Sequence, residues 1–176
     1  MKLYLTRLTI PDDPVLRRKA QSDIGKRLLW MALAREGIDC SALILERSTE
    51  GRPYLRYGDG RAFALDFSIS HGGAWVVCAL SEVEHSPIGV DLERIRAVSP
   101  KVWGRYLATV PDEAVGDPYT AILRWTRYEA AFKKEGRVTS TDLLGKGCAT
   151  LRPIPGYLLT VAGNEAVSEL CFVSVN

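Results

Sequence analysis

Residues 88–95, IGVDLERI, constrain the fold more than any other stretch of the chain. Their apolar residues are typical of a buried strand, yet Asp91 and Glu93 stand two positions apart within it. Residues i and i+2 of a strand project from one face, so the two carboxylates share a side. Such a pair is costly to bury unless a cation compensates it. The strand therefore either exposes this face to solvent or meets a positive charge, and Mg²⁺ suits an all-oxygen site.

The order of the other expected elements suggests two halves of similar design. A strand at 1–8 precedes a helix over 24–36, capped by Ser22 or Asp23 and ended by Gly37. Strands at 63–70 and 74–81 flank a turn, HGG. After the strand at 88–95 comes a helix over 118–135, with Asp117 as its cap and Gly136 at its end, and then three short strands. We therefore predict an α+β fold with an N-terminal half (1–86) and a C-terminal half (87–176).

Composition narrows the functional classes. The 176 residues are 47% hydrophobic and 25% charged, with a net charge of +2, which is typical of a globular protein and too weak to suggest nucleic-acid binding. No apolar run approaches a membrane span, and the first residues do not resemble a signal peptide. Four scattered cysteines without metal-binding spacing predict buried free thiols in a reducing compartment, so we expect a cytoplasmic protein: Cys40, Cys78, Cys148 and Cys171.

The helix expected over 118–135 brings a third carboxylate into consideration. Its 3.6-residue period predicts a buried apolar stripe made of Ala121, Trp125, Tyr128 and Phe132. Glu129 lies at the shoulder of this stripe, one turn before Lys133. Glu129 either forms a weak ion pair with Lys133 or shares one cation with the two strand carboxylates.

Four segments, in this order and at these separations, resemble the motif series of the Sfp-type 4′-phosphopantetheinyl transferases: GRPYL (51–55), FSISHGG (67–73), IGVDLERI (88–95) and WTRYEAAFKKEG (125–136). The resemblance implies two pseudo-symmetric α+β halves with coenzyme A and Mg²⁺ in the cleft between them. It also implies the reaction. The phosphopantetheine arm of coenzyme A moves to a serine hydroxyl of an apo acyl or peptidyl carrier protein, and adenosine 3′,5′-bisphosphate is released.

The resemblance also assigns roles to residues. It implies that three carboxylates bind the metal, and that Glu129 also takes the serine proton. Lys133 would reach the coenzyme A phosphates, and three further side chains would bind there too. The metal set is Asp91, Glu93 and Glu129; the coenzyme A set is Arg52, Ser70, His71 and Lys133. The basic first helix either contributes Lys26 or Arg27 to the 3′-phosphate or presents a solvated basic face.

Two positions depart from the family pattern. Arg52 stands where a lysine is usual, which keeps a cation but changes its geometry. Tyr128 also replaces a usual lysine, which removes a positive charge beside the phosphates. A weak relative that binds coenzyme A or a carrier protein without transfer is therefore one alternative. A metal-dependent phosphodiester hydrolase is another, although the sequence offers no second metal site or further base for it.

The partners follow from the same resemblance. The carrier would belong to fatty acid, polyketide or non-ribosomal peptide synthesis. Carrier proteins of this kind tend to be acidic, so the basic segment after the carboxylate strand is a candidate docking surface: Arg94, Arg96, Lys101 and Arg105. Two fused halves would complete the cleft within one chain, which favours a monomer.

Overall fold

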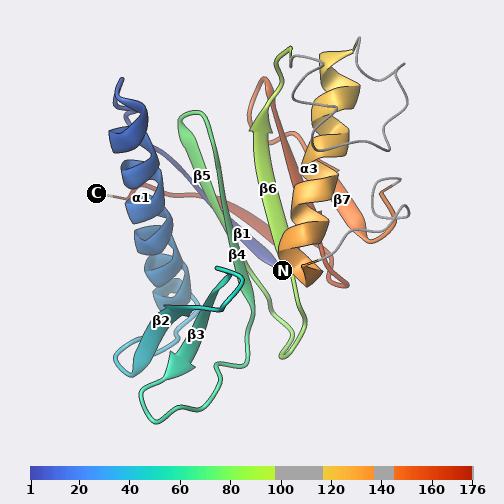
Figure 1. Ribbon diagram of the computed structural model, residues 1–176. Helices are drawn as coiled ribbons and strands as arrows, with labels where there is room; N and C mark the ends of the chain where they lie inside the picture. The colour runs from blue at the N-terminus through green and yellow to red at the C-terminus, as the bar shows by residue number, and fades with distance from the viewer. Residues whose placement is uncertain (98–116, 137–144, 176) are drawn as a thin grey trace.

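The computed structural model describes residues 1–97, 117–136 and 145–175. It confirms the α+β class (Figure 1). Its elements, in order, are β1 (Lys2–Arg7), α1 (Pro14–Arg35), β2 (Leu43–Arg47), β3 (Pro53–Tyr57), β4 (Phe67–Gly72), β5 (Trp75–Leu80), β6 (Gly89–Arg94), α3 (Pro118–Glu135), β7 (Cys148–Leu151), β8 (Tyr157–Ala162) and β9 (Glu169–Phe172).

Among the described residues, two sheets pack with helices α1 and α3, and strands β2 and β3 form a separate hairpin. One sheet has the order β4-β5-β1-β9 and the other the order β6-β8-β7. Figure 1 shows α1 and α3 on opposite sides of the strands. Strand β9 pairs in parallel with β1, so the end of the described chain completes the sheet formed by its beginning. The division at residue 87 stays a prediction, and this pairing crosses it.

The alternation of side chains along the strands builds two cores. Leu3 and Leu5 of β1 contribute to a core that also contains residues of β6 and β8. Tyr4, between them, belongs to a second core formed with α1 and the β2–β3 hairpin. The four-stranded sheet is therefore buried on both faces, because successive residues of a strand point to opposite sides.

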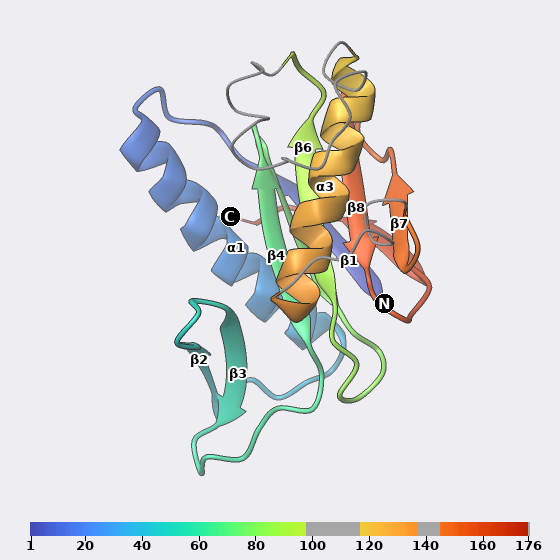
Figure 2. The same cartoon turned by 45° about the vertical axis from the view of Figure 1, so that its right-hand side comes forward.

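The two sheets meet along their edge strands, β4 and β6, which lie side by side (Figure 2). Serine side chains of β4 join them. The Ser68 hydroxyl accepts a hydrogen bond from the Val90 N–H at 3.0 Å, and the Ser70 hydroxyl accepts one from the Leu92 N–H at 3.3 Å. These two backbone N–H groups at the edge of β6 thus find partners inside the fold, where they would otherwise be unpaired.

Two glycines permit close approach at this junction. A Cβ on Gly72 would lie 2.4 Å from the Leu92 carbonyl oxygen of β6. A Cβ on Gly89 would lie 1.9 Å from the Ala130 carbonyl oxygen of α3. Neither distance is compatible with a side chain, so glycine lets β6 contact both β4 and α3 closely.

Helices α1 and α3 each begin at an aspartate followed by a proline. Asp117 accepts hydrogen bonds from the Tyr119 and Thr120 N–H groups, and α3 ends at Gly136 in the left-handed conformation, as predicted. The predicted start of the first helix at Ser22 or Asp23 is wrong. Helix α1 begins at Pro14, because Asp13 accepts hydrogen bonds from the first N–H groups and Pro14 suits the first helical turn.

The predicted buried stripe of α3 is also wrong in most of its members. Phe132 is 48% exposed, and Trp125 and Tyr128 are only partly buried. The face packed on the sheet carries mostly small residues: Ala121, Ile122, Thr126, Ala130 and Ala131. Small side chains are needed there because the helix backbone touches Gly89.

No disulfide joins the four cysteines, but the prediction that all of them are buried is wrong, because Cys78 alone among them is fully buried. Helices α1 and α3 both lack an apolar stretch long enough to span a membrane.

Candidate active site

The predicted carboxylate strand meets a positive charge, and that charge is Lys133. Asp91 is 5% exposed on β6. Its Oδ1 accepts hydrogen bonds from Lys133 Nζ at 2.7 Å and from the Ser70 hydroxyl at 2.8 Å. Lys133 also donates to Ser70 Oγ at 3.0 Å and to the Val90 carbonyl oxygen at 3.1 Å. The structure thus brings three predicted site residues, from β4, β6 and α3, into direct contact.

The other two predicted metal ligands, Glu93 and Glu129, both lie close enough to Asp91 for its charge to affect their pKa values. Loss of hydration raises the pKa of Glu93, the negative charge of Asp91 raises it further, and a hydrogen bond with Trp125 opposes the rise. Burial and then Asp91 likewise raise the pKa of Glu129, against the charge of Lys133. Each of the two glutamates is therefore destabilised in its charged form by its surroundings.

The donor chemistry of these residues fits a hard divalent cation. The Oδ2 atom of Asp91 is buried and has no hydrogen-bond partner within the described part of the chain. An unpartnered carboxylate oxygen in the interior is costly, and a cation would satisfy it. In the present arrangement, no three histidine, cysteine or acidic side chains among the described residues stand close enough together to hold a metal ion. Lys133 occupies the other oxygen of Asp91 instead.

A cavity of about 670 Å³ borders this cluster between α3 and the β2–β3 hairpin. Three cationic residues line it, namely Arg52, Lys133 and Lys134, together with two acidic residues, Glu50 and Glu135, and apolar surface that includes Pro53 and Phe132. Its mixture of cations and apolar groups suits a ligand with both phosphate and apolar parts.

His71 lines a second cavity of about 380 Å³, together with Lys26 of α1 and Arg47 of β2. Partial loss of hydration and the nearby Lys133 lower the pKa of His71, so its imidazole is neutral at pH 7. An anion bound here would raise that pKa again. Of the two residues proposed for the 3′-phosphate, Lys26 therefore lies beside a predicted site residue.

Arg52 lines the larger cavity, but its guanidinium is already bonded. It donates to the backbone carbonyl oxygens of Lys133 and Lys134 and to the Asp66 carboxylate. Asp66 and the bond of Ser68 to β6 were not predicted. Asp66 lies outside the motifs, and although Ser68 lies within FSISHGG, its role depends on a partner that is distant in the sequence.

Of the predicted docking segment, Arg94 and Arg96 are exposed. Lys101 and Arg105 lie outside the residues that the structure describes.

We expect Glu129→Gln to stabilise the fold near pH 7 in the absence of divalent cations. A carboxyl whose pKa is higher in the folded protein than in the unfolded chain destabilises the fold above that pKa. The gain in unfolding free energy should shrink as pH falls through the raised pKa, and vanish below the ordinary value of 4.5. Urea denaturation across this pH range measures it, with the exposed Glu84→Gln as control. A variant less stable than the parent at pH 7 would contradict this electrostatic account.

Tyr128 stacks between Trp125 and Phe132, with ring centroids 6.1 Å and 6.3 Å away. We expect Tyr128→Lys to lower the free energy of unfolding by about 1 kcal/mol through lost ring contacts. Tyr128→Phe keeps the ring and should retain nearly full stability. Thermal unfolding compares the two variants. Unchanged stability of the lysine variant, with tighter binding of coenzyme A, would instead place residue 128 at the phosphates.

Parts of the chain are similar to known 4′-phosphopantetheinyl transferases. Residues 14–83 match the family model described as 4′-phosphopantetheinyl transferase, N-terminal. A 4′-phosphopantetheinyl transferase of Bacillus subtilis is 29% identical over 130 residues, covering 68% of this chain and 54% of that protein. The 4′-phosphopantetheinyl transferase Sfp of B. subtilis strain 168 is 33% identical over 86 residues, covering 44% of this chain and 36% of that protein.

A third relative, the 4′-phosphopantetheinyl transferase gsp of Aneurinibacillus migulanus, is 33% identical over 60 residues, covering 34% of this chain and 22% of that protein. The aligned regions thus span about half or less of the length of these relatives. The family match covers α1 through β5, and the site described above continues on β6 and α3. Taken together, the matches show that this chain is similar, over part of its length, to 4′-phosphopantetheinyl transferases, including the Sfp and gsp proteins, and the α+β fold is compatible with that likeness.

Proposed function

We propose that the chain transfers the 4′-phosphopantetheine arm of coenzyme A to a serine hydroxyl of an apo acyl or peptidyl carrier protein, with Mg²⁺ as the metal. The observation that carries this proposal is the Asp91–Ser70–Lys133 cluster beside a cavity whose wall includes Arg52, Lys133 and Lys134. The names of the three relatives support the same reaction.

The bonds that change define what the site must do. The serine oxygen attacks the phosphorus that carries the pantetheine arm. The bond from that phosphorus to the oxygen bridging the two phosphates breaks, and adenosine 3′,5′-bisphosphate leaves with the electron pair. Negative charge increases on the bridging oxygen and stays spread over the transferred group, so fixed positive charge nearby lowers the barrier.

Several residues of the chain would supply that charge or move the proton. Lys133 and Lys134 lie on the cavity wall, and His71 would become a cation when an anion binds beside it. Glu129 is the proposed base for the serine proton, and its raised pKa brings it closer to neutral pH, where general bases act best.

The proposed metal ligands are Asp91, Glu93 and Glu129. A divalent cation bound to them would neutralise charge on the phosphate oxygens. Ser70 would keep Asp91 oriented, because its hydroxyl both donates to Oδ1 and accepts from the Leu92 N–H. The ammonium group of Lys133 compensates Asp91 in the present structure, and a divalent cation bound to Asp91 would take over that role.

Mass spectrometry of an apo carrier protein tests the proposal. The carrier is incubated with the full chain, coenzyme A and Mg²⁺, and a carrier whose target serine is replaced by alanine serves as control. We expect the mass of one phosphopantetheine group to be added to the first carrier and none to the second. An unchanged carrier, with coenzyme A bound but intact, would support the binding-only alternative, and cleaved coenzyme A would support a hydrolase.

A further inference from the structure

The guanidinium of Arg52, which precedes β3, contacts the end of α3 and the residue before β6. Its Nη1 donates to the carbonyl oxygens of Lys133 and Lys134, the latter at 2.8 Å, in the last turn of α3. Its Nη2 donates to the carbonyl oxygen of Ile88 at 3.1 Å, immediately before β6. Both nitrogens that end the side chain are therefore engaged with backbone acceptors.

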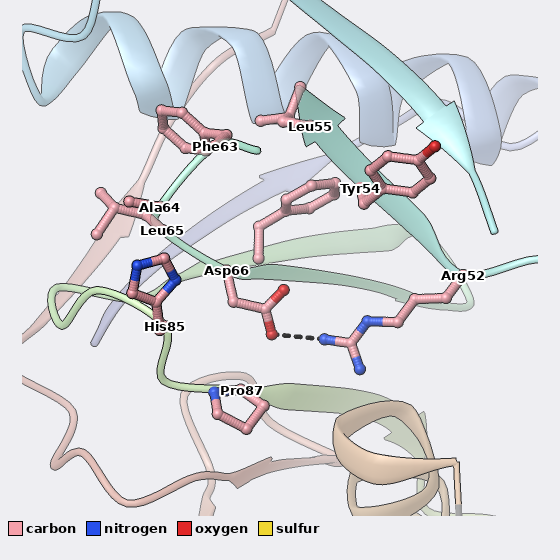
Figure 3. Close-up of a pocket in the computed structure, with 10 residues that line it drawn as sticks. Arg52, Tyr54, Leu55, Phe63, Ala64, Leu65, Asp66, His85 and Pro87 are labelled. Carbon is pink, nitrogen blue, oxygen red and sulfur yellow. Dashed lines mark hydrogen bonds and ion pairs between the residues drawn. The ribbon is translucent and has the colours of Figure 1, made fainter. Parts of the chain in front are cut away.

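Asp66, the residue immediately before β4, completes this arrangement. Its Oδ2 lies 2.5 Å from Arg52 Nη2 and accepts a hydrogen bond from the Ile88 N–H at 2.8 Å. Figure 3 shows the two side chains facing each other at the edge of a further cavity of about 400 Å³, beside Pro87. One carboxylate oxygen thus fixes both the guanidinium and the beginning of the carboxylate strand.

We propose that Asp66 and Arg52 form a clamp that fixes the last turn of α3, and that both are positioning residues for Lys133. This inference rests on the proposed function and adds two residues to its machinery. Arg52 holds the backbone carbonyl of Lys133, while the ammonium group of the same residue reaches Asp91. A movement of this turn therefore moves the cation directly.

The chemistry of the two side chains explains why arginine suits this position. The carbonyl groups of the last helical turn lack partners within the helix and carry the negative end of its dipole, so a cation there is favourable. Arginine presents several donors in a fixed plane, and here two of its nitrogens contact four acceptors. A lysine at residue 52 has a single nitrogen and cannot reproduce this set.

The charge of Asp66 is what selects this orientation. Arg52 also lines the cavity of about 670 Å³ proposed for coenzyme A, so its guanidinium has two directions available. The carboxylate of Asp66 draws it toward α3 and β6. Without that charge, the same arginine would be free to turn into the cavity, and the last turn of α3 would lose its anchor.

Two variants test the clamp, each compared with the parent protein. Asp66→Asn removes the charge but retains an oxygen that accepts from the Ile88 N–H, and Arg52→Lys removes the planar set of donors but retains the charge. Asp59→Asn is the matched control, because Asp59 also pairs with an arginine, Arg61, at 2.8 Å but on an exposed loop. Circular dichroism and thermal unfolding establish that each variant is folded.

The first measurement is the steady-state kinetics of transfer to the carrier. We expect kcat to fall on the order of a hundredfold in both variants, the range typical of a displaced catalytic group, with KM for the carrier unchanged. The double variant should be no slower than the slower single variant, because both changes release the same turn. Asp59→Asn should match the parent. Kinetic constants equal to the parent in a folded Asp66→Asn or Arg52→Lys variant would overturn the proposal.

The second measurement does not depend on activity. Reductive methylation of lysines, followed by peptide mass spectrometry, reports the accessibility of Lys133, with the exposed Lys146 as an internal reference. We expect Lys133 to be methylated several-fold faster in both clamp variants and at an unchanged rate in Asp59→Asn. An unchanged methylation rate of Lys133 in a folded clamp variant would overturn the clamp, whether or not the parent protein modifies the carrier. A parent without transferase activity but with faster Lys133 labelling in the variants would refute the proposed function and leave the clamp standing.

Discussion

Replacing Gly89 by alanine should destabilise the protein by about 3 kcal/mol or more. The added Cβ would lie 1.9 Å from the Ala130 carbonyl oxygen and 2.8 Å from the Lys134 backbone nitrogen. Both atoms belong to the backbone of α3, so no side chain can move aside to make room. Helix and strand must separate, and the contact that brings Lys133 to Asp91 separates with them.

Urea denaturation of the variant measures this effect. Gly58→Ala is the matched control, because a Cβ there meets only the Ala42 carbonyl oxygen, at an ordinary distance of 3.8 Å. The control should change the free energy of unfolding by no more than about 0.5 kcal/mol. A Gly89→Ala variant as stable as the control would show that β6 and α3 do not pack as closely as described.

Asp91→Asn should lower the rate of transfer by about a thousandfold, the upper range for losing one group that stabilises charge in a transition state. The amide keeps an oxygen for Ser70 and Lys133 but cannot supply the negative charge that a divalent cation needs. The fold should survive. Lys133 keeps 29% of its side chain exposed, and Glu93 and Glu129 lose a repelling neighbour, so we expect a stability change within about 1 kcal/mol.

Intact-mass assays of the carrier over time measure that rate, with the surface variant Asp23→Asn as control. Isothermal titration with Mg²⁺ gives an independent readout, since the variant should bind the ion more weakly than the parent. A folded Asp91→Asn protein with normal transfer would remove Asp91 from the site.

Much of the site was predictable because its residues obey local rules. The two-residue spacing of Asp91 and Glu93 placed both carboxylates on one face, and Asp117 and Gly136 marked the ends of α3. The cation that compensates Asp91 was not predictable as Lys133, which the sequence analysis directed to the phosphates. That contact depends on how near α3 comes to β6. Gly89 permits the close approach, but its contact with α3 becomes apparent only in the folded structure.

The errors have equally specific causes. The segment PDDP at 11–14 contains both a cap and a first-turn proline, but Ser22 and Asp23 offer a second possible cap within the same helix, so the predicted start fell too far along the chain. The aromatic residues of α3 have helical spacing, but the helix packs through alanines because large rings would hold it away from Gly89. Asp66 had no signal in the sequence, since its partners, Arg52 and Ile88, come from other elements.

In the proposed reaction, the phosphopantetheine arm moves to the carrier and the nucleotide is released. One reaction tests this, in which apo carrier protein and Mg²⁺ are combined with coenzyme A that carries a stable isotope in its pantetheine arm, and the products are analysed by mass spectrometry. We predict that the label appears on the serine of the carrier, in equal molar amount with unlabelled adenosine 3′,5′-bisphosphate. Label recovered as free phosphopantetheine, or only as intact coenzyme A, with the carrier unmodified, would contradict it.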